Sequence, residues 1–210
     1  MIRTVGERAF LLECRSPLVV AAAARAACAA RAIELAEVVP AAATVLVQAA
    51  DVGRAADLRE ALAGIDEAGS EQPMPAHPLP QPPEAARIEI AVHFDGPDLA
   101  AVAEATGLTT AEVISTLVET PFTAAFTGFA PGFAYLTSLP PRLRLPRRVT
   151  PRTRVPAGSL AIAEEYAAVY PRASPGGWRL LGRTDQVLFD PRRDPPALIS
   201  PGTVVRFRQA

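Results

Sequence analysis

The first part of the chain alternates between strand-like and helix-like patterns of hydrophobic and polar positions. Ser16 and Pro17 form a helix start, with serine as the N-cap and proline in the first turn. Leu58, Leu62 and Ile65 share one face of a second helix. The expected elements are strands over 8–14, 33–39 and 44–49 and helices over 16–32 and 53–67. This βαββα order predicts a small α+β domain, with a later strand completing its sheet.

The second part of the chain begins with an alternating strand over residues 87–94. A short helix follows and is stopped by Gly107. Thr109 and Glu112 then have the spacing of a capping box, which predicts the start of another helix. After that helix the pattern changes to short apolar stretches cut by proline and glycine. Short strands with frequent turns predict a mostly antiparallel β-barrel or sandwich over 87–210.

Between these two parts lies a proline-rich stretch, with six prolines among residues 73–83. Such a run favours extended polyproline geometry and excludes a helix or an inner strand. The net charge also changes here, from −4 over residues 1–86 to +3 over 87–210. The sequence therefore predicts a domain at 1–72, a linker at 73–86 and a second domain at 87–210.

Composition narrows the classes of function. Half of the 210 residues are hydrophobic, and the net charge is −1, which favours a folded protein over a disordered chain or a general nucleic-acid binder. All 21 basic residues are arginine, which excludes lysine chemistry such as a Schiff base or a P-loop.

Cysteine usage and hydropathy bear on localisation. Two scattered cysteines, Cys14 and Cys28, suit no closed zinc site and indicate the cytoplasm, although one disulfide between them is possible. The first residues lack the apolar core of a signal peptide. The apolar stretch from Leu18 to Ala30 is interrupted by Arg25 and is too short to cross a bilayer, so no membrane association is expected.

Residues 128–136 read GFAPGFAYL, with two glycines and a proline among aromatic side chains. Glycine and proline fix a bend and let the backbone come close to a neighbour. The residues alone favour a tight barrel corner filled by phenylalanine. The alternative is a pocket wall with backbone N–H groups that face a ligand. Its lining residues would be Gly128, Phe129, Pro131, Phe133 and Tyr135.

Residues 139–154 hold six arginines, no acidic residue and four prolines. Rigidly held guanidinium groups suit bidentate capture of a carboxylate or phosphate. For most of these arginines a solvated surface or a salt bridge is the more common outcome. Arg147 and Arg152 each follow a proline directly, and they are the better ligand candidates.

Residues 155–184 contain three further glycine- and proline-rich motifs. Ser159 follows a glycine and could be a nucleophile, but activation needs a base and the only histidine of this domain, His93, lies in another stretch. Ser159 and Ser174 fit better as hydroxyl donors or turn formers. The Gly176–Gly177 backbone could bind an oxyanion. Candidate binding residues are Pro156, Gly158, Tyr170, Ser174, Gly176, Gly177 and Trp178, the last of which is more often a core residue.

The order of these motifs is specific. GFxPGFxYL is followed by LPxxLxxPRRxTPRTRVPAGS, then by YPxxSPGGWxxxGRT and LFDPxR. This order, gap-free from about Gly96 to Arg193, resembles the KipI family, whose members are also called the B-type subunit of 5-oxoprolinase or allophanate hydrolase subunit 1. The first domain matches that family only in layout.

The resemblance implies an α+β N-terminal domain followed by a cyclophilin-like β-barrel domain. It also implies a partner, the C-type subunit (allophanate hydrolase subunit 2), and a third subunit of LamB/YcsF type. In this family such subunits form an ATP-using enzyme that opens the lactam of 5-oxo-L-proline to give L-glutamate. The catalytic candidates are then Arg152, Ser159 and Arg183, with Arg147 in substrate binding and ATP either at a face shared with the partner or on the partner itself.

One stretch departs from the family pattern. Members usually read IAGxQTGIYP, whereas this chain has Glu164, Tyr166, Ala167 and Ala168 in place of the Gly, Gln, Thr and Gly. Losing paired polar groups changes recognition of a polar substrate by orders of magnitude. Two alternatives therefore stay open, a non-catalytic regulatory protein like the kinase-inhibiting branch, and a carboxyltransferase-type protein acting on urea or allophanate.

Overall fold

The computed structural model describes residues 1–71 and 86–210, with only the backbone described at 66–71. The chain divides into two units, Met1–Glu84 and Ala85–Ala210. Each unit has its own sheet and its own hydrophobic core. Except for Ala86, the predicted linker at 73–86 lies outside the described residues.

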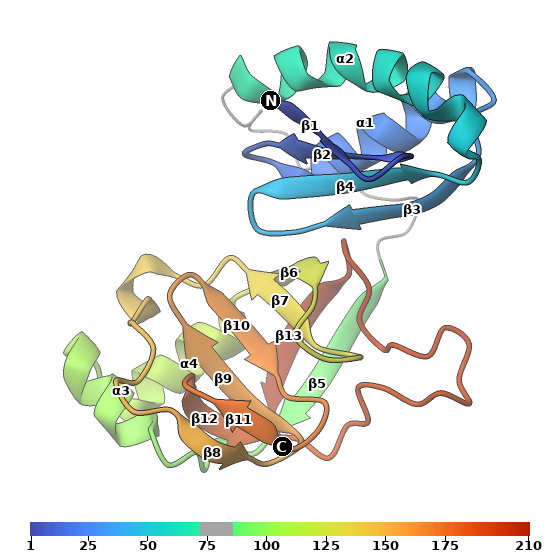
Figure 1. The fold of residues 1–210 in the computed structure, drawn as a ribbon. Helices are drawn as coiled ribbons and strands as arrows, with labels where there is room; N and C mark the ends of the chain where they lie inside the picture. The colour runs from blue at the N-terminus through green and yellow to red at the C-terminus, as the bar shows by residue number, and fades with distance from the viewer. Residues whose placement is uncertain (72–85) are drawn as a thin grey trace. The chain divides into compact units, whose positions relative to one another are not determined.

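In its described part, the first unit is a four-stranded antiparallel sheet with two α-helices on one face (Figure 1). The elements are β1 (Ile2–Val5), β2 (Ala9–Glu13), α1 (Pro17–Ala30), β3 (Leu35–Pro40), β4 (Thr44–Ala49), η1 (Val52–Arg54) and α2 (Ala55–Glu71). The strand order is β1-β2-β4-β3. Three of these strands were predicted, and the strand that completes the sheet is β1, which precedes them in the chain. The prediction that a later strand completes this sheet is therefore wrong.

Helix α1 begins where the sequence predicts. Pro17 lies in its first turn, and the carbonyl of the preceding Ser16 accepts the N–H of Val20 at 3.0 Å. Its buried face, which includes Ala24 and Cys28, packs in one core with Leu58 and Leu62 of α2. Because this core excludes water, burial raises the pKa of the Cys28 thiol.

The second unit, described from residue 86 onward, is built on a seven-stranded sheet. Its elements are β5 (Arg87–Val92), α3 (Leu99–Thr106), α4 (Thr110–Glu119), β6 (Phe122–Thr127), β7 (Ala134–Thr137), η2 (Pro141–Leu143), β8 (Arg152–Val155), β9 (Ser159–Ala163), β10 (Tyr166–Val169), β11 (Ser174–Gly176), β12 (Arg179–Arg183) and β13 (Val204–Gln209). The sheet order is β12-β9-β10-β7-β6-β13-β5, and β8 pairs with β11 separately. Only β13 and β5 run parallel among these described pairs.

The segment that follows β5 returns to the opposite edge of the sheet and nearly closes it into a barrel. His93 and Arg183 exchange backbone hydrogen bonds of 2.8 and 2.9 Å. Further along, the N–H of Gly96 donates to Leu181 and that of Asp98 to Leu180. A Cβ on Gly96 would lie 2.3 Å from the carbonyl carbon of Leu181, so only glycine allows this approach.

Strands β9 and β10 are buried on both faces, which explains their continuous apolar sequence. Leu160 and Ile162 belong to the large core that also contains residues of α3 and α4. Ala161 and Ala163, on the opposite face because side chains alternate along a strand, belong to a smaller aromatic core. The smaller core contains several of the predicted binding residues.

Two local helix signals are confirmed. Helix α3 ends at Gly107, whose φ of 68° is the left-handed conformation that glycine adopts without strain. The capping box is also present, since the side chains and backbone N–H groups of Thr109 and Glu112 bond reciprocally.

We predict that Gly96→Ala destabilises the second unit by about 3 kcal/mol, because the added methyl group must displace backbone. Urea unfolding followed by the fluorescence of Trp178, the only tryptophan, measures this unit. Gly128→Ala is the matched control, since its Cβ would meet nothing closer than 3.8 Å. Equal unfolding midpoints for the two variants would show that the barrel does not need this contact.

Candidate functional site

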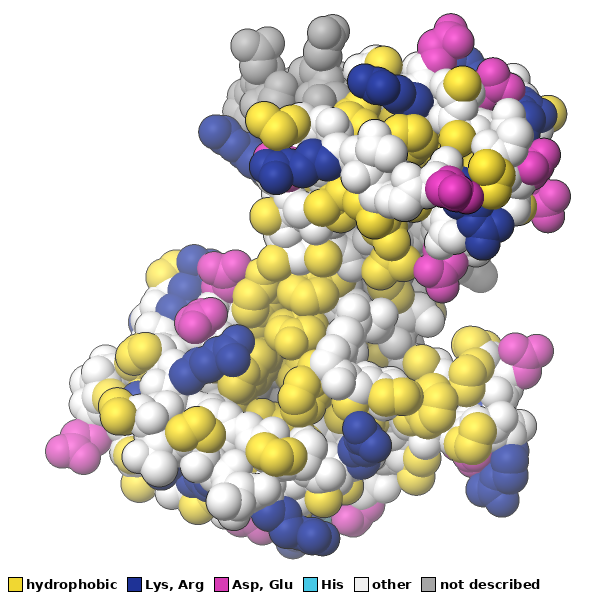
Figure 2. Space-filling view, in the orientation of Figure 1, with side chains coloured by type: hydrophobic (Ala, Val, Ile, Leu, Met, Phe, Trp, Pro, Cys, Tyr) yellow, Lys and Arg dark blue, Asp and Glu magenta, His cyan; other side chains and the backbone are white. Residues whose placement is uncertain are grey.

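Seven aromatic side chains form a cluster on the face of the sheet that carries Ala161 and Ala163. We call it the aromatic cluster; its members are Phe126, Phe129, Phe133, Tyr135, Tyr166, Tyr170 and Trp178. Phe133 lies at its centre, with ring centroids 5.4 Å from Tyr170 and 5.6 Å from Trp178 in edge-to-face contact. In Figure 2, hydrophobic side chains gather over β6, β7 and β10, with acidic and basic side chains at one edge of that surface.

The GFAPGF motif forms the connection between β6 and β7. Phe133 is buried, whereas Phe129 is 59% exposed and has a φ of 66°. Gly132 also has a positive φ, and a Cβ there would lie 2.7 Å from that of Phe189. The corner interpretation therefore holds for Phe133 and Gly132, and Phe129 extends the aromatic cluster to the surface.

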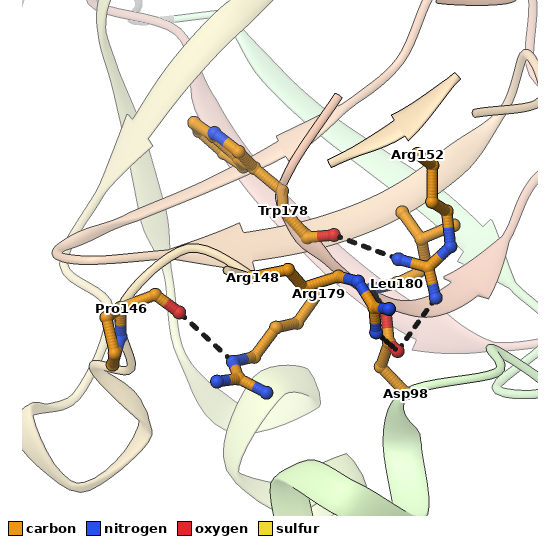
Figure 3. Close-up of polar contacts among 7 residues, drawn as sticks. All are labelled: Asp98, Pro146, Arg148, Arg152, Trp178, Arg179 and Leu180. Atoms are coloured by element: carbon orange, nitrogen blue, oxygen red, sulfur yellow. Dashed lines mark hydrogen bonds and ion pairs between the residues drawn. The ribbon is translucent and has the colours of Figure 1, made fainter. Parts of the chain in front are cut away.

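Arg148 and Arg152 share one buried carboxylate, that of Asp98 (Figure 3). The Oδ1 atom of Asp98 accepts from both guanidinium groups at 2.8 Å, and its Oδ2 atom accepts the N–H of Leu180 at 2.7 Å. The Asp98 side chain is 5% exposed. Arg152 also donates to the carbonyl of Trp178, which links this network to the aromatic cluster.

The charge state of Asp98 follows from these contacts. Burial disfavours its ionised form, but the hydrogen bonds from Arg152 and Leu180 and the two positive charges outweigh burial, and the pKa of Asp98 lies below its usual value. Two guanidinium groups against one carboxylate leave one net positive charge beside the aromatic cluster.

Sequence reasoning missed Asp98. It lies 50 and 54 positions before Arg148 and Arg152, and nothing in its local sequence indicates the pairing. The available signal was indirect, because six arginines without a nearby acid need counter-charge from elsewhere in the fold. Asp98 is also the residue before α3, yet its side chain makes no helix cap.

The other predicted arginines differ in what they contact. Arg142 donates to Thr116 and Arg144 to the carbonyl of Leu139. Arg147 is 57% exposed and lies 3.6 Å from a carboxylate oxygen of Glu164. Arg183 pairs with Asp95 at 2.9 Å on an exposed edge. The predicted catalytic pair Arg152 and Arg183 therefore uses two different carboxylates.

Arg147 lies beside the aromatic cluster. A Cβ on Gly177 would be 3.9 Å from the Cβ of Arg147. Burial raises the pKa of the nearby Tyr170 hydroxyl, while the positive charges of Arg147 and Arg152 act against it. A Cβ on Gly176 would lie 2.4 Å from the Tyr170 oxygen, so this glycine makes room for the phenol.

The predicted serines and neighbouring turn residues serve the backbone. Ser159 is buried, and its hydroxyl donates to the carbonyl of Pro156 at 2.9 Å. Gly158, with a φ of 78°, allows close approach to Thr184. The Oγ atom of Ser174 is buried and has no hydrogen-bond partner among the described residues. None of these contacts supplies Ser159 with a general base.

Tyr166 stands where the family pattern has glutamine. Its ring is 5.6 Å from those of Phe126 and Tyr135. Burial, the hydrogen bond to Glu165 and the charges of Glu165 and Glu164 raise the pKa of Tyr166 to about 12. The phenol therefore stays neutral at physiological pH.

Over the described part of the chain, no group of three or more His, Cys, Asp or Glu side chains is arranged to hold a metal ion. None of the described helices combines the length and the apolar character that a membrane span requires.

Comparison with known proteins identifies relatives. A family model described as "Carboxyltransferase domain, subdomain C and D" matches residues 1–199. The B-type subunit of 5-oxoprolinase from Escherichia coli O157:H7 is 49% identical over 128 residues, covering 60% of this chain and 59% of that protein. Its counterpart from Bacillus subtilis (strain 168) is 41% identical over 123 residues, covering 57% of this chain and 51% of that protein. The chain spans just over half the length of these curated relatives.

Solved structures share the fold. The crystal structure of TTHA0988 superposes with a TM-score of 0.75 at 34% identity, covering 97% of this chain and 39% of that one. Urea carboxylase of Kluyveromyces lactis superposes with a TM-score of 0.65 over 100% of this chain and 21% of that one. At 18% identity, the second likeness supports the fold alone.

We predict that Asp98→Asn lowers the stability of the second unit by about 3 kcal/mol at pH 7, because a buried charge loses its partner. Urea unfolding followed by Trp178 fluorescence measures the loss. Asp95→Asn is the matched control, because its pair with Arg183 is half exposed and should be worth less than about 1 kcal/mol. Similar losses from both variants would contradict a special role for the buried pair.

The same carboxylate predicts an acid dependence. Because the pKa of Asp98 is lowered by folding, its stabilisation is complete above the unfolded-state pKa of about 3.9 and is lost as the pH falls through the lower folded-state value. Unfolding midpoints between neutral and acid pH should therefore fall more steeply for the wild type than for Asp98→Asn. If the unfolding midpoints of the two proteins fall equally with pH, groups other than Asp98 cause the loss of stability in acid.

Proposed function

The chain belongs to the KipI family of carboxyltransferase domains, and from that premise we propose that it is the B-type subunit of a 5-oxoprolinase-like enzyme. The complex would open the lactam of 5-oxo-L-proline to L-glutamate at the expense of ATP, in the cytoplasm. The observation that carries the proposal is the match of the family model to residues 1–199, together with relatives named for that subunit.

The chemistry of the site agrees with such a reaction. An amide resists nucleophilic attack until its carbonyl group is polarised or its oxygen is phosphorylated. The enzyme therefore needs cationic groups and N–H donors around the negative charge that develops on that oxygen. The exposed Arg147, the excess positive charge of the Asp98 network and the backbone at Gly176–Gly177 lie around the aromatic cluster. An aromatic wall would hold the apolar ring of a lactam, and Arg147 would bind its carboxylate.

We propose that this chain does not bind ATP on its own. Arg142, Arg144, Arg148 and Arg152 already donate to protein groups, and the chain has no lysine for a P-loop. Of the predicted ligand candidates, Ser159 is also engaged by a carbonyl. We therefore place ATP at a face shared with the partner or on the partner itself, and assign this chain no step in phosphoryl transfer.

The finer fold and the partners complete the proposal. We assign the second unit to the cyclophilin-like barrels, preceded by an α+β domain. The C-type subunit would supply a related barrel, and a LamB/YcsF-type protein would complete the enzyme.

One observation favours the regulatory alternative. Ser159 and the arginines Arg148 and Arg152 bind protein groups, and positions 164–168 lack the amide and hydroxyl groups of the family pattern. A non-catalytic protein would keep this framework and stabilise a partner. The same complex distinguishes the two functions, since a regulatory protein binds the C-type partner without supporting turnover.

We predict that Arg147→Ala lowers kcat/KM for 5-oxoproline by tenfold or more, because one charge-assisted hydrogen bond is worth roughly 1.5–3 kcal/mol. The measurement is ATP-dependent release of glutamate by this chain co-expressed with its C-type and LamB/YcsF-type partners. Arg154→Ala is the matched control, because Arg154 is an exposed arginine of the same segment and no contact places it at the aromatic cluster.

One result would contradict the proposed function, and another would contradict the role of Arg147 within it. Turnover no greater than that of the partner proteins alone would exclude a catalytic contribution. Turnover that is equally insensitive to both arginine substitutions would keep the enzyme assignment but remove Arg147 from the substrate site.

A further inference from the structure

We propose that Glu164 is a specificity-determining residue whose carboxylate competes with the carboxylate of the ligand for Arg147. The inference rests on the proposed function in one respect, the placement of Arg147 in the binding site. It concerns residues of this chain alone and has a test that does not depend on turnover.

The turn between β9 and β10 brings the two residues together. Ala163 pairs with Tyr166, so Glu164 and Glu165 form a two-residue turn. The N–H of Glu164 donates to the carbonyl of Leu145 at 2.7 Å, and its carboxylate lies 3.6 Å from Nε of Arg147. This backbone hydrogen bond ties the turn to residues 139–154, the arginine segment. The Glu164 side chain faces Arg147 of that segment.

Glu164 has a backbone conformation that is unfavourable for glutamate. Its φ of 55° is the left-handed region, which costs free energy for any residue with a Cβ and which glycine enters freely. Hairpin turns with this conformation favour glycine, asparagine or aspartate. Backbone strain of this kind is concentrated at functional sites of proteins.

Arg147 differs from its neighbours in what holds it. Arg148 and Arg152 are held by the buried Asp98, whereas the partner of Arg147 is the surface carboxylate of Glu164. Both members of this pair are more than half exposed, at 57% and 56%. An exposed ion pair of this kind is weak, so a dissolved carboxylate displaces it at a modest cost.

The neighbouring Glu165 is an internal control. It carries the same charge on the same turn, but its carboxylate interacts with the Tyr166 hydroxyl and helps to raise the pKa of that group. Removing Glu165 therefore changes the charge of the turn without releasing Arg147. A specific competitor and a general electrostatic effect predict different results for the two positions.

The experiment titrates acetate, a probe that carries the carboxylate alone, into the full chain labelled with ¹⁵N at arginine. The Nε–H signal of Arg147 is assigned by its loss in Arg147→Ala. We expect Glu164→Gln to tighten acetate binding at this signal about threefold, and Glu165→Gln to leave it within error of the wild type. Glu164→Gly, which also suits the positive φ, should reproduce the gain and raise the unfolding midpoint.

The same variants are then compared in the assembled complex with 5-oxoproline and with its neutral analogue 2-pyrrolidinone. KM or Kd should fall for the carboxylate ligand alone. Equal gains from Glu164→Gln and Glu165→Gln, or no change at the Arg147 signal, would overturn the inference. If Glu164 competes with acetate for Arg147 but the assembled complex shows no turnover, the proposed enzymatic function is refuted and the inference about Glu164 stands.

Discussion

The second unit depends on one buried negative charge. Asp98 accepts three hydrogen bonds from groups on different segments, two guanidinium groups and a backbone N–H. A carboxylate removed from water is tolerated only when it is paired and bonded in this way. The same contact therefore fixes the arginine segment against β12, orders the start of α3 and places Arg152 next to Trp178.

The charge of Asp98 divides the arginines near the aromatic cluster into two kinds. Those that bind Asp98 are part of the framework and provide a fixed positive field at the aromatic cluster. Arg147 is outside that network and is held by a weak surface pair with Glu164. A rigid positive charge and an exchangeable one thus both lie beside the aromatic cluster, which suits recognition of a small anionic ring.

The sequence predicted features that depend on residues close together in the chain, and it missed contacts between residues far apart in it. The capping box at Thr109 and the glycine stop at Gly107 are local signals, and both elements formed as expected. Strand β1 was missed because its four residues are mostly exposed and show no alternation. The motifs collected most members of the aromatic cluster, but the pairing of Asp98 with arginines some fifty positions away has no local signature.

The position of β13 bears on how the protein is made. This last strand lies between β5 and β6, so it supplies the parallel neighbour of the first strand of the unit and the antiparallel neighbour of the second. Contacts between the two ends of a segment are formed late, because a large loop must close first. During translation, the barrel consequently stays open until residue 209 has left the ribosome, and its unpaired strands need protection from aggregation in that interval.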